Sequence, residues 1–186
     1  MTLKNIIKAT CAMLNREDVL EYLNDTNYQP TNDTLSALNI MVSLVNLVIG
    51  ELAGTFIPMV KTETMQVKNG KVKYADLSER CVKVVGVLGK NGEKLTYKHT
   101  PEFIVVSGEE VSVCYEYIPP NYGLDDEIGY AEDEVSVATL SYGLSAEYAI
   151  SKGNFDEAVM WHERFVNSVA SKRKLKNSSV KARSFV

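Results

Sequence analysis

Residues 34–53 read TLSALNIMVSLVNLVIGELA, and the chain changes its hydrophobic period immediately after them, at Gly54. Within this stretch apolar side chains recur three and four residues apart, which is the period of a helix with a buried seam. The seam consists of Leu35, Leu38, Val42, Val45, Ile49 and Leu52. Because Asn39, Ser43 and Asn46 interrupt the apolar run, we expect a core helix rather than a membrane span.

The region after Gly54 alternates apolar and polar residues, as half-buried strands do. Asn69-Gly70 lies between two short alternating runs, and Asn91-Gly92 repeats this signal. Both pairs suit a two-residue hairpin, because its turn positions need positive φ. Ser107-Gly108 separates two further runs, 103–106 and 111–118. About six strands at this spacing predict a small antiparallel barrel or sandwich in which neighbours pair across each turn.

Helical signals occur on both sides of this β region. Asn15 is placed to cap a second short helix near the N-terminus. The helical period returns in residues 134–151, and Gly153 suits the position after that helix. Asn154 and Glu157 then form a capping-box pattern at the start of the last helix. The apolar stripe of this helix consists of Phe155, Ala158, Val159, Phe165, Val166, Val169 and Ala170.

The order of these elements predicts an α+β fold, with a helical bundle of about four to five helices and an inserted small antiparallel β module. Of the 186 residues, 45% are hydrophobic and 24% are charged, as in a protein with an ordinary core. We expect the bundle to comprise 1–54 and 131–175, and the β module to comprise 55–120. An acidic loop, 121–130, and a basic C-terminal docking tail, 176–186, complete the organisation.

Charge is distributed unevenly, although the whole chain carries only −4. The last helix is closed by Lys172, Arg173 and Lys174, which suit the negative end of a helix dipole. Residues 171–186 hold six basic residues and no acidic one, which leaves 14 basic against 24 acidic residues elsewhere. The acidic extreme comprises Asp125, Asp126, Glu127, Glu132, Asp133 and Glu134. Separate blocks of opposite sign are typical of copies that meet one another or a charged partner; a solvated loop and a frayed tail are the alternative.

Catalytic chemistry has few candidate residues. Cys11, Cys81 and Cys114 show no metal-binding or redox spacing, so we interpret them as core thiols in a reducing compartment. His99 and His162 are the only histidines, and no two-histidine metal motif exists. The sequence also lacks a phosphate-binding loop and a nucleophile elbow. We therefore expect no catalytic residue, no metal site and no cofactor.

The C-terminal tail ends in an apolar pair behind spaced basic residues. Its last residues are KARSFV, 181–186, and they include Lys181, Arg183, Phe185 and Val186. This pattern is typical of a docking peptide, in which basic groups position the segment and the last side chains fill a pocket. Phosphate contacts with nucleic acid are the alternative. Aromatic residues do not alternate with the basic ones, which favours docking.

The last third of the chain resembles the head-to-tail connector (adaptor) proteins of tailed bacteriophages, including the tail-tubular, gatekeeper-like type. The strand VSVCYEY, 111–117, ends at two prolines, and a linker and a helix rich in small residues follow. The helix DEAVMWHERF, 156–165, comes next, and the chain closes with KARSFV. Family members often end in a similar aromatic and aliphatic pair after an arginine. The resemblance covers most of the chain as architecture and about 155–186 as motif.

This resemblance implies a structural virion protein, not an enzyme, that forms a ring of about twelve copies beneath the portal. The ring would extend the channel for packaged DNA and provide the surface on which downstream tail proteins assemble, with no membrane involved. Portal docking would fall on Arg183, Phe185 and Val186, with Lys181 in support. The acidic block would face a neighbouring copy or the channel. The protein would lie in the neck of the virion, and in the host cytoplasm during assembly.

Two alternatives come from other classes of protein. A tail or baseplate β module could bind a protein or a sugar at its hairpin tips, and exposed Tyr74 and Tyr97 would favour it. An enzyme could use scattered carboxylates, which predicts a pocket with two convergent acids of raised pKa.

Overall fold

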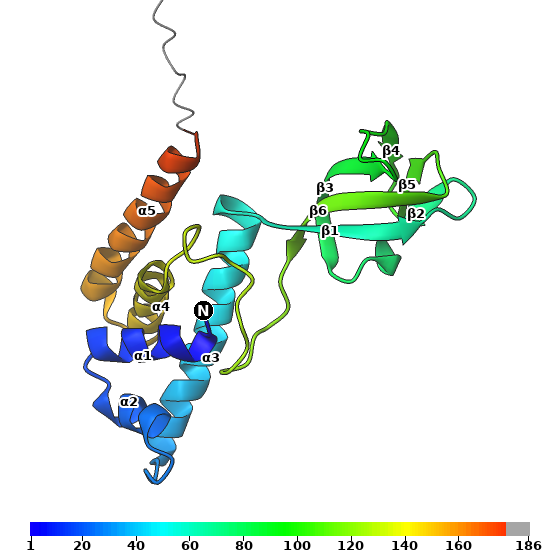
Figure 1. The fold of residues 1–186 in the computed structure, drawn as a ribbon. Coiled ribbons are helices and arrows are strands. Elements are labelled where there is room, and N and C mark those ends of the chain that lie inside the picture. The colour runs from blue at the N-terminus through cyan, green and yellow to red at the C-terminus, as the bar shows by residue number, and fades with distance from the viewer. Residues whose placement is uncertain (178–186) are drawn as a thin grey trace, which may run out of the picture. The chain divides into compact units, whose positions relative to one another are not determined.

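The computed structural model describes the backbone of residues 1–177 and the side chains of residues 1–171, and it confirms the α+β class. The chain divides into two compact units. The helical unit comprises Met1–Ile49 and Asn121–Val186, and the β unit comprises Gly50–Pro120 (Figure 1).

Up to residue 177, the helical unit contains five helices. They are α1 (Leu3–Met13), α2 (Glu17–Asn24), α3 (Asn32–Glu51), α4 (Val137–Ser151) and α5 (Phe155–Asn177). Side-chain caps start three of them, because the first N–H groups of a helix have no partner inside it. Thr2, Thr31 and Ser136 accept hydrogen bonds from the backbone N–H groups three residues further on.

Asn15 does not cap α2, so this prediction was wrong. Its φ of 52° places it in the left-handed region directly after α1, and the Arg16 N–H donates to the Cys11 carbonyl at 2.9 Å. This six-to-one bond is the Schellman ending of a helix, and Asn tolerates the left-handed position better than most residues. The residue therefore ends α1 instead of starting α2.

The turn between α4 and α5 follows the same rule. Gly153 has φ 78°, as predicted, and the Asn154 N–H donates to the Ala149 carbonyl at 2.9 Å. That donor is therefore already used, and the reciprocal half of the expected capping box does not form. Glu157 instead accepts a hydrogen bond from Trp161 Nε1 at 3.2 Å, one helical turn away.

Helix α4 lies at the centre of the helical unit. Its fully or nearly fully buried side chains come from every side of the helix: Thr139, Leu140, Ser141, Leu144, Ser145, Ala146, Tyr148 and Ala149. A Cβ atom on Gly143 would lie 2.7 Å from Val48 Cγ1 of α3 and 3.2 Å from the ring of Phe165 on α5. The missing side chain therefore allows three helices to meet at one point.

The β unit contains six strands, in two small antiparallel sheets of three that do not close into a barrel. The strands are β1 (Met59–Gln66), β2 (Lys71–Lys73), β3 (Arg80–Gly89), β4 (Tyr97–His99), β5 (Phe103–Val106) and β6 (Glu110–Ile118). A π-helical turn, Leu52–Phe56, precedes β1, and a 3-10 turn, Tyr74–Asp76, follows β2. The β unit has one apolar core, and Val113 and Tyr115 of β6 are completely buried in it.

The strands do not pair across the turns as predicted. The first sheet has the order β1-β6-β3, and the second has the order β2-β5-β4. Asn69 and Gly70 do adopt positive φ, 54° and 70°, but the hairpin closes only through the isolated bridge between Lys68 and Lys71. The turns at Asn69-Gly70, Asn91-Gly92 and Ser107-Gly108 carry the chain from one sheet to the other, so β6 becomes the neighbour of β1 and β3, whereas the consecutive strands β4 and β5 do pair with each other.

The carboxylate of Glu63, on the edge strand β1, accepts several hydrogen bonds. Glu63 accepts hydrogen bonds from the Ser78 N–H at 3.0 Å, from the Ser78 hydroxyl and from Tyr115 Oη at 2.9 Å. Burial alone would raise the pKa of Glu63, but these hydrogen bonds outweigh it and lower the pKa to about 2.

Gly143→Ala should destabilise the helical unit by about 1–3 kcal/mol, because the added methyl group overpacks the junction of α3, α4 and α5. Gly50→Ala is the matched control. Gly50 also lies in a helix, but nothing lies within 4 Å of its added Cβ, so the higher helix propensity of alanine should stabilise by up to about 1 kcal/mol. Urea unfolding measures both, and equal effects would contradict the close approach.

Glu63→Gln should destabilise the β unit by about 1.5–3 kcal/mol at pH 7, because a neutral amide cannot replace a carboxylate that accepts several bonds. The folded pKa lies below the ordinary value of 4.5, so this stabilisation exists above that pH and is lost as the pH falls toward 2. Chemical unfolding between pH 7 and 3 measures it. Exposed Glu102→Gln is the control, and a pH-independent loss would contradict the assignment.

Candidate assembly surfaces

The acidic segment between β6 and α4 is an ordered loop fixed to the start of α1. The N–H groups of Leu3 and Lys4 donate to the carbonyls of Asp126 and Leu124, at 3.3 and 2.8 Å. The Ile128 N–H donates back to the Met1 carbonyl at 2.9 Å. Unpaired N–H groups at a helix start thus hold the loop, and the positive end of the helix dipole lies beside its acids.

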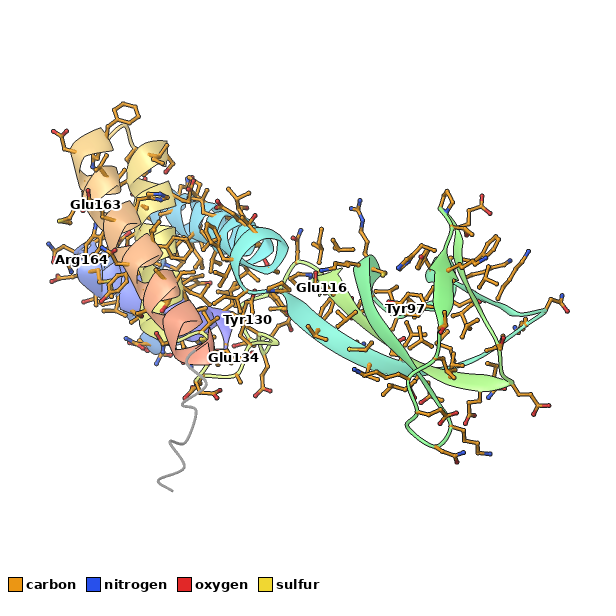
Figure 2. The ribbon with its side chains drawn as sticks, turned by 90° about the horizontal axis from the view of Figure 1, so that it is seen from above. Tyr97, Glu116, Tyr130, Glu134, Glu163 and Arg164 are labelled. Atoms are coloured by element: carbon orange, nitrogen blue, oxygen red, sulfur yellow. The ribbon has the colours of Figure 1, made fainter. Side chains whose placement is uncertain are left out.

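A second anchor comes from α3. Asn46 accepts a hydrogen bond from the Tyr122 N–H at 2.7 Å and donates one to the Tyr122 carbonyl at 3.0 Å, so its amide pairs with the backbone as a strand would. Buried Ile128 and Tyr130 complete the attachment. Figure 2 shows Tyr130 and Glu134 on this segment. The alternative of a solvated loop therefore describes its side chains but not its backbone, which is hydrogen-bonded to α1 and α3.

The acidic side chains themselves lie on the surface of this loop. Asp125, Asp126, Glu127, Glu132 and Asp133 are exposed, and Glu134 is half-buried. The backbone of α5 continues through Lys172, Arg173 and Lys174 to Asn177. The predicted docking residues Lys181, Arg183, Phe185 and Val186 lie outside the described residues.

Helix α3 has an outer face that its own unit leaves uncovered. The buried residues include Leu38, Val45 and Ile49, as predicted, but Leu35 is 38% exposed and Leu47 is 57% exposed. A shallow depression of about 570 Å³ lies on this face. Its lining comprises Asn32, Leu35, Ser36, Asn39, Ile40, Ser43 and Leu44. The predicted seam is therefore buried except at Leu35 and at half-buried Val42, and the exposed Leu47 lies outside it.

The apolar stripe predicted on α5 is only partly buried, and it divides into a buried row and an adjacent exposed row. Ala158, Trp161, Phe165 and Val169 are buried against the unit. Phe155, Val159 and Val166 are exposed, at 67%, 60% and 38%, and lie four and seven residues apart in a row beside the buried one. Figure 2 also shows Glu163 and Arg164 on this helix. Because water-facing helix positions are usually charged, this second row forms an exposed apolar ridge.

By length and composition alone, Asn32–Phe56 could cross a membrane, and it is the one such segment within residues 1–177. Only 39% of its most apolar window is buried. The sequence predicts a helix buried in the core, whereas the structure leaves much of that helix exposed.

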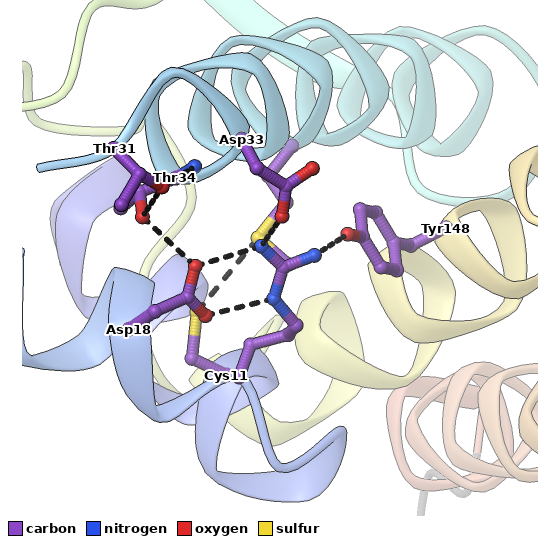
Figure 3. A network of polar contacts seen from close by, with 8 residues as sticks. Cys11, Asp18, Thr31, Asp33, Thr34 and Tyr148 are labelled. Atoms are coloured by element: carbon purple, nitrogen blue, oxygen red, sulfur yellow. Dashed lines mark hydrogen bonds and ion pairs between the residues drawn. The ribbon is translucent and has the colours of Figure 1, made fainter.

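A network of charges holds the first turn of α3 in place (Figure 3). Arg16 donates two hydrogen bonds to the carboxylate of Asp18, both at 2.9 Å, and reaches Asp33 at 3.2 Å and the Tyr148 hydroxyl. The Thr34 hydroxyl donates to Asp18 at 3.0 Å. The two-pronged Arg–carboxylate geometry fixes direction as well as distance. It thereby joins α2, α3 and α4 below the outer face of α3.

Arg16 and Thr34 lower the pKa of Asp18 to about 2, chiefly through the hydrogen bond from Arg16. The shift of this carboxyl group, like that of Glu63, is opposite to what a general acid needs. Burial raises the pKa of the Cys11 thiol to about 11, which keeps it in the unreactive protonated form. Among the described side chains, no three His, Cys, Asp or Glu residues are grouped to hold a metal ion.

The aromatic residues considered for a binding role of the β unit are partly used within it. Tyr74 and Tyr97 are half-buried and pack against the β core. The Tyr74 hydroxyl lies 3.1 Å from His99 Nδ1, and the rings of Tyr97 and His99 meet edge to face. Structural contacts therefore account for these side chains.

No known protein-family model matches the chain, and no curated protein sequence matches it. The candidate surfaces consequently stand on geometry and charge. The sequence indicated the acidic loop and the basic tail. It did not indicate the outer faces of α3 and α5, although the charge-free run from 34 to 50 was a visible signal.

Asp18→Asn should destabilise the helical unit by about 1–2 kcal/mol at pH 7, a value reduced for partial exposure of the pair. The folded pKa lies below the ordinary 3.8, so the stabilisation is present above that pH and disappears as the pH falls toward 2. Urea unfolding at pH 7 and pH 3 measures the difference. Exposed Asp25→Asn is the control, and a gap that stays constant with pH would contradict this role.

Proposed function

We propose that the chain is a structural virion protein of a tailed bacteriophage, a head-to-tail connector that forms a ring beneath the portal. The ring extends the DNA channel and provides the attachment surface for downstream tail proteins. The protein acts in the neck of the virion and is present in the host cytoplasm during assembly. We propose no enzymatic activity for it.

One observation carries this proposal beyond the resemblance of residues 155–186. The helical unit has two different exposed apolar faces, one on α3 and one on α5. A head-to-tail ring needs two different complementary patches on each subunit, whereas a two-fold dimer needs only one patch. A monomer that functions alone needs neither.

The distribution of charge supports the same function. Residues 1–49 and 121–171 hold 15 acidic and 5 basic residues, whereas 172–186 hold six basic residues and no acidic one. An acidic body repels the phosphates of packaged DNA, so DNA in the channel of the ring would slide past the protein without binding to it. The basic tail, ending in Phe185-Val186, would dock on the portal, and the block 125–134 would face the channel or the next copy.

The direct test mixes the purified protein with portal rings from the same source. Native mass measurement should find a complex with a fixed stoichiometry near twelve copies per portal ring. No affinity for portal at micromolar concentrations would overturn the connector function and favour a tail or baseplate module that binds a protein or a sugar.

Deletion of 181–186 should leave the unfolding midpoint unchanged and abolish portal binding, because α5 ends at Asn177, before the deleted residues. A variant with the same six residues in scrambled order keeps the charge but not the order of the docking residues. It should fail as well if docking is specific. Restored binding by the scrambled tail would reduce the contact to electrostatics, and unfolding of the truncated protein would make the tail part of the fold.

A further inference from the structure

The outer face of α3 is unusual because it has no charge. Residues 34–50 contain no Asp, Glu, Lys or Arg, yet Ser36, Asn39, Ser43 and Leu47 are exposed. A helix face that meets water normally carries charged side chains, and one without them is normally covered. We therefore expect a surface outside the helical unit to cover this face of α3.

The exposed ridge on α5 matches the depression on α3 in length. The depression extends from Asn32 to Leu44, which is roughly 18 Å along a helix. The ridge extends from Phe155 to Val166, which is roughly 17 Å. Phe155 alone, at 67% exposure, offers roughly 100 Å² or more of apolar surface.

The two surfaces also match in the spacing of large and small side chains. Exposed Val159 and Val166 lie seven residues apart on α5, and exposed Ser36 and Ser43 lie seven residues apart on α3. Two large side chains can therefore fit above two small ones at the same repeat, as knobs fit into holes between packed helices.

A polar residue occupies the same place in each row. Asn39 lies three residues after Ser36 and four before Ser43, and exposed His162 lies three after Val159 and four before Val166. When the rows align, the Asn39 amide and the His162 imidazole meet near the centre, where they can share a hydrogen bond. A single polar pair inside an apolar helix contact fixes its register.

We propose that the α5 ridge of one copy packs into the α3 depression of the next copy. Val159 and Val166 lie over Ser36 and Ser43, and Asn39 pairs with His162. The inference deepens the proposed function, and rests on it for closure of the contacts into a ring. The occupant is a second copy because the chain itself carries the surface that fits. The contact would also bury the Asn39 amide, which a protein partner can hydrogen-bond and lipid tails cannot.

The experiment uses one arginine on each surface. Val159→Arg disables the ridge, and Ser43→Arg disables the depression; both positions are exposed, and arginine suits a helix better than the residue it replaces. Met160→Arg places the same charge on another side of α5, and Ser43→Ala keeps a small side chain in the depression, so that the depression stays open. These two serve as matched controls.

Sedimentation of the full chain at concentrations up to about 1 mM measures self-association. Wild type and both controls should associate in a concentration-dependent way, and each arginine variant alone should remain monomeric, with at least a tenfold weaker association. An equimolar mixture of Val159→Arg and Ser43→Arg should form dimers and nothing larger, because each pair of copies retains one intact ridge and one intact depression.

Several outcomes would overturn this contact. A monomeric wild type at the highest concentration would do so, as would dimers of Ser43→Arg alone, which indicate a symmetric ridge-to-ridge contact. Flotation of wild type, but not of Ser43→Arg, with phosphatidylcholine–phosphatidylglycerol vesicles would assign the face to lipid. Portal binding of the same variants separates the two proposals: self-association without portal binding overturns only the connector function, and portal rings filled by both arginine variants overturn only the contact.

Discussion

The close approach of α3, α4 and α5 around Gly143 determines which surfaces of the helical unit are buried. Val48 and Phe165 reach the backbone of α4 there, and no methyl group fits between them. Because the buried residues of α4 point in nearly every direction around the helix, each neighbouring helix contributes only one face to the core. The face of α3 opposite its buried residues and the row on α5 beside its buried residues are left outside, and their apolar side chains have no place within the unit. The packing of one central helix thereby creates the surfaces that we assign to assembly.

Charge limits how copies of this unit can meet. Fifteen acidic against five basic residues on the described helical side chains make approaching copies repel at long range. The face formed by 34–50 carries none of that charge, so desolvating it needs no buried ion pair. The acidic loop is fixed to α1 and to Asn46, and this keeps its carboxylates in defined positions. Association would therefore be favourable at the apolar faces and would strengthen as salt screens the acids.

Local signals in the sequence were sufficient for most helices and turns. The seam of α3, the left-handed Gly153 and the positive φ angles of Asn69-Gly70 depend on nearby residues alone. The strand partners were not predictable in this way, because β6 pairs with β1 and β3 to bury Tyr115 and Val113, contacts that span the whole unit. Asn15 failed for a related reason. The same residue type suits a helix start and a left-handed helix end, and the length of α1 decided between them.

The apolar pattern of a single helix cannot distinguish burial inside one chain from burial between chains. On α5 the sequence gives one wide stripe, whereas the structure separates Ala158, Phe165 and Val169 from Phe155, Val159 and Val166. An apolar stripe that is wider than the face buried by the fold thus indicates a partner. The sequence shows the width of the stripe, but the structure is needed to show which part of it is buried. On α3 the same excess occurs without any charge over 34–50. Two uncovered faces of similar length on one unit are more than its solubility as a monomer requires, and a head-to-tail contact uses both.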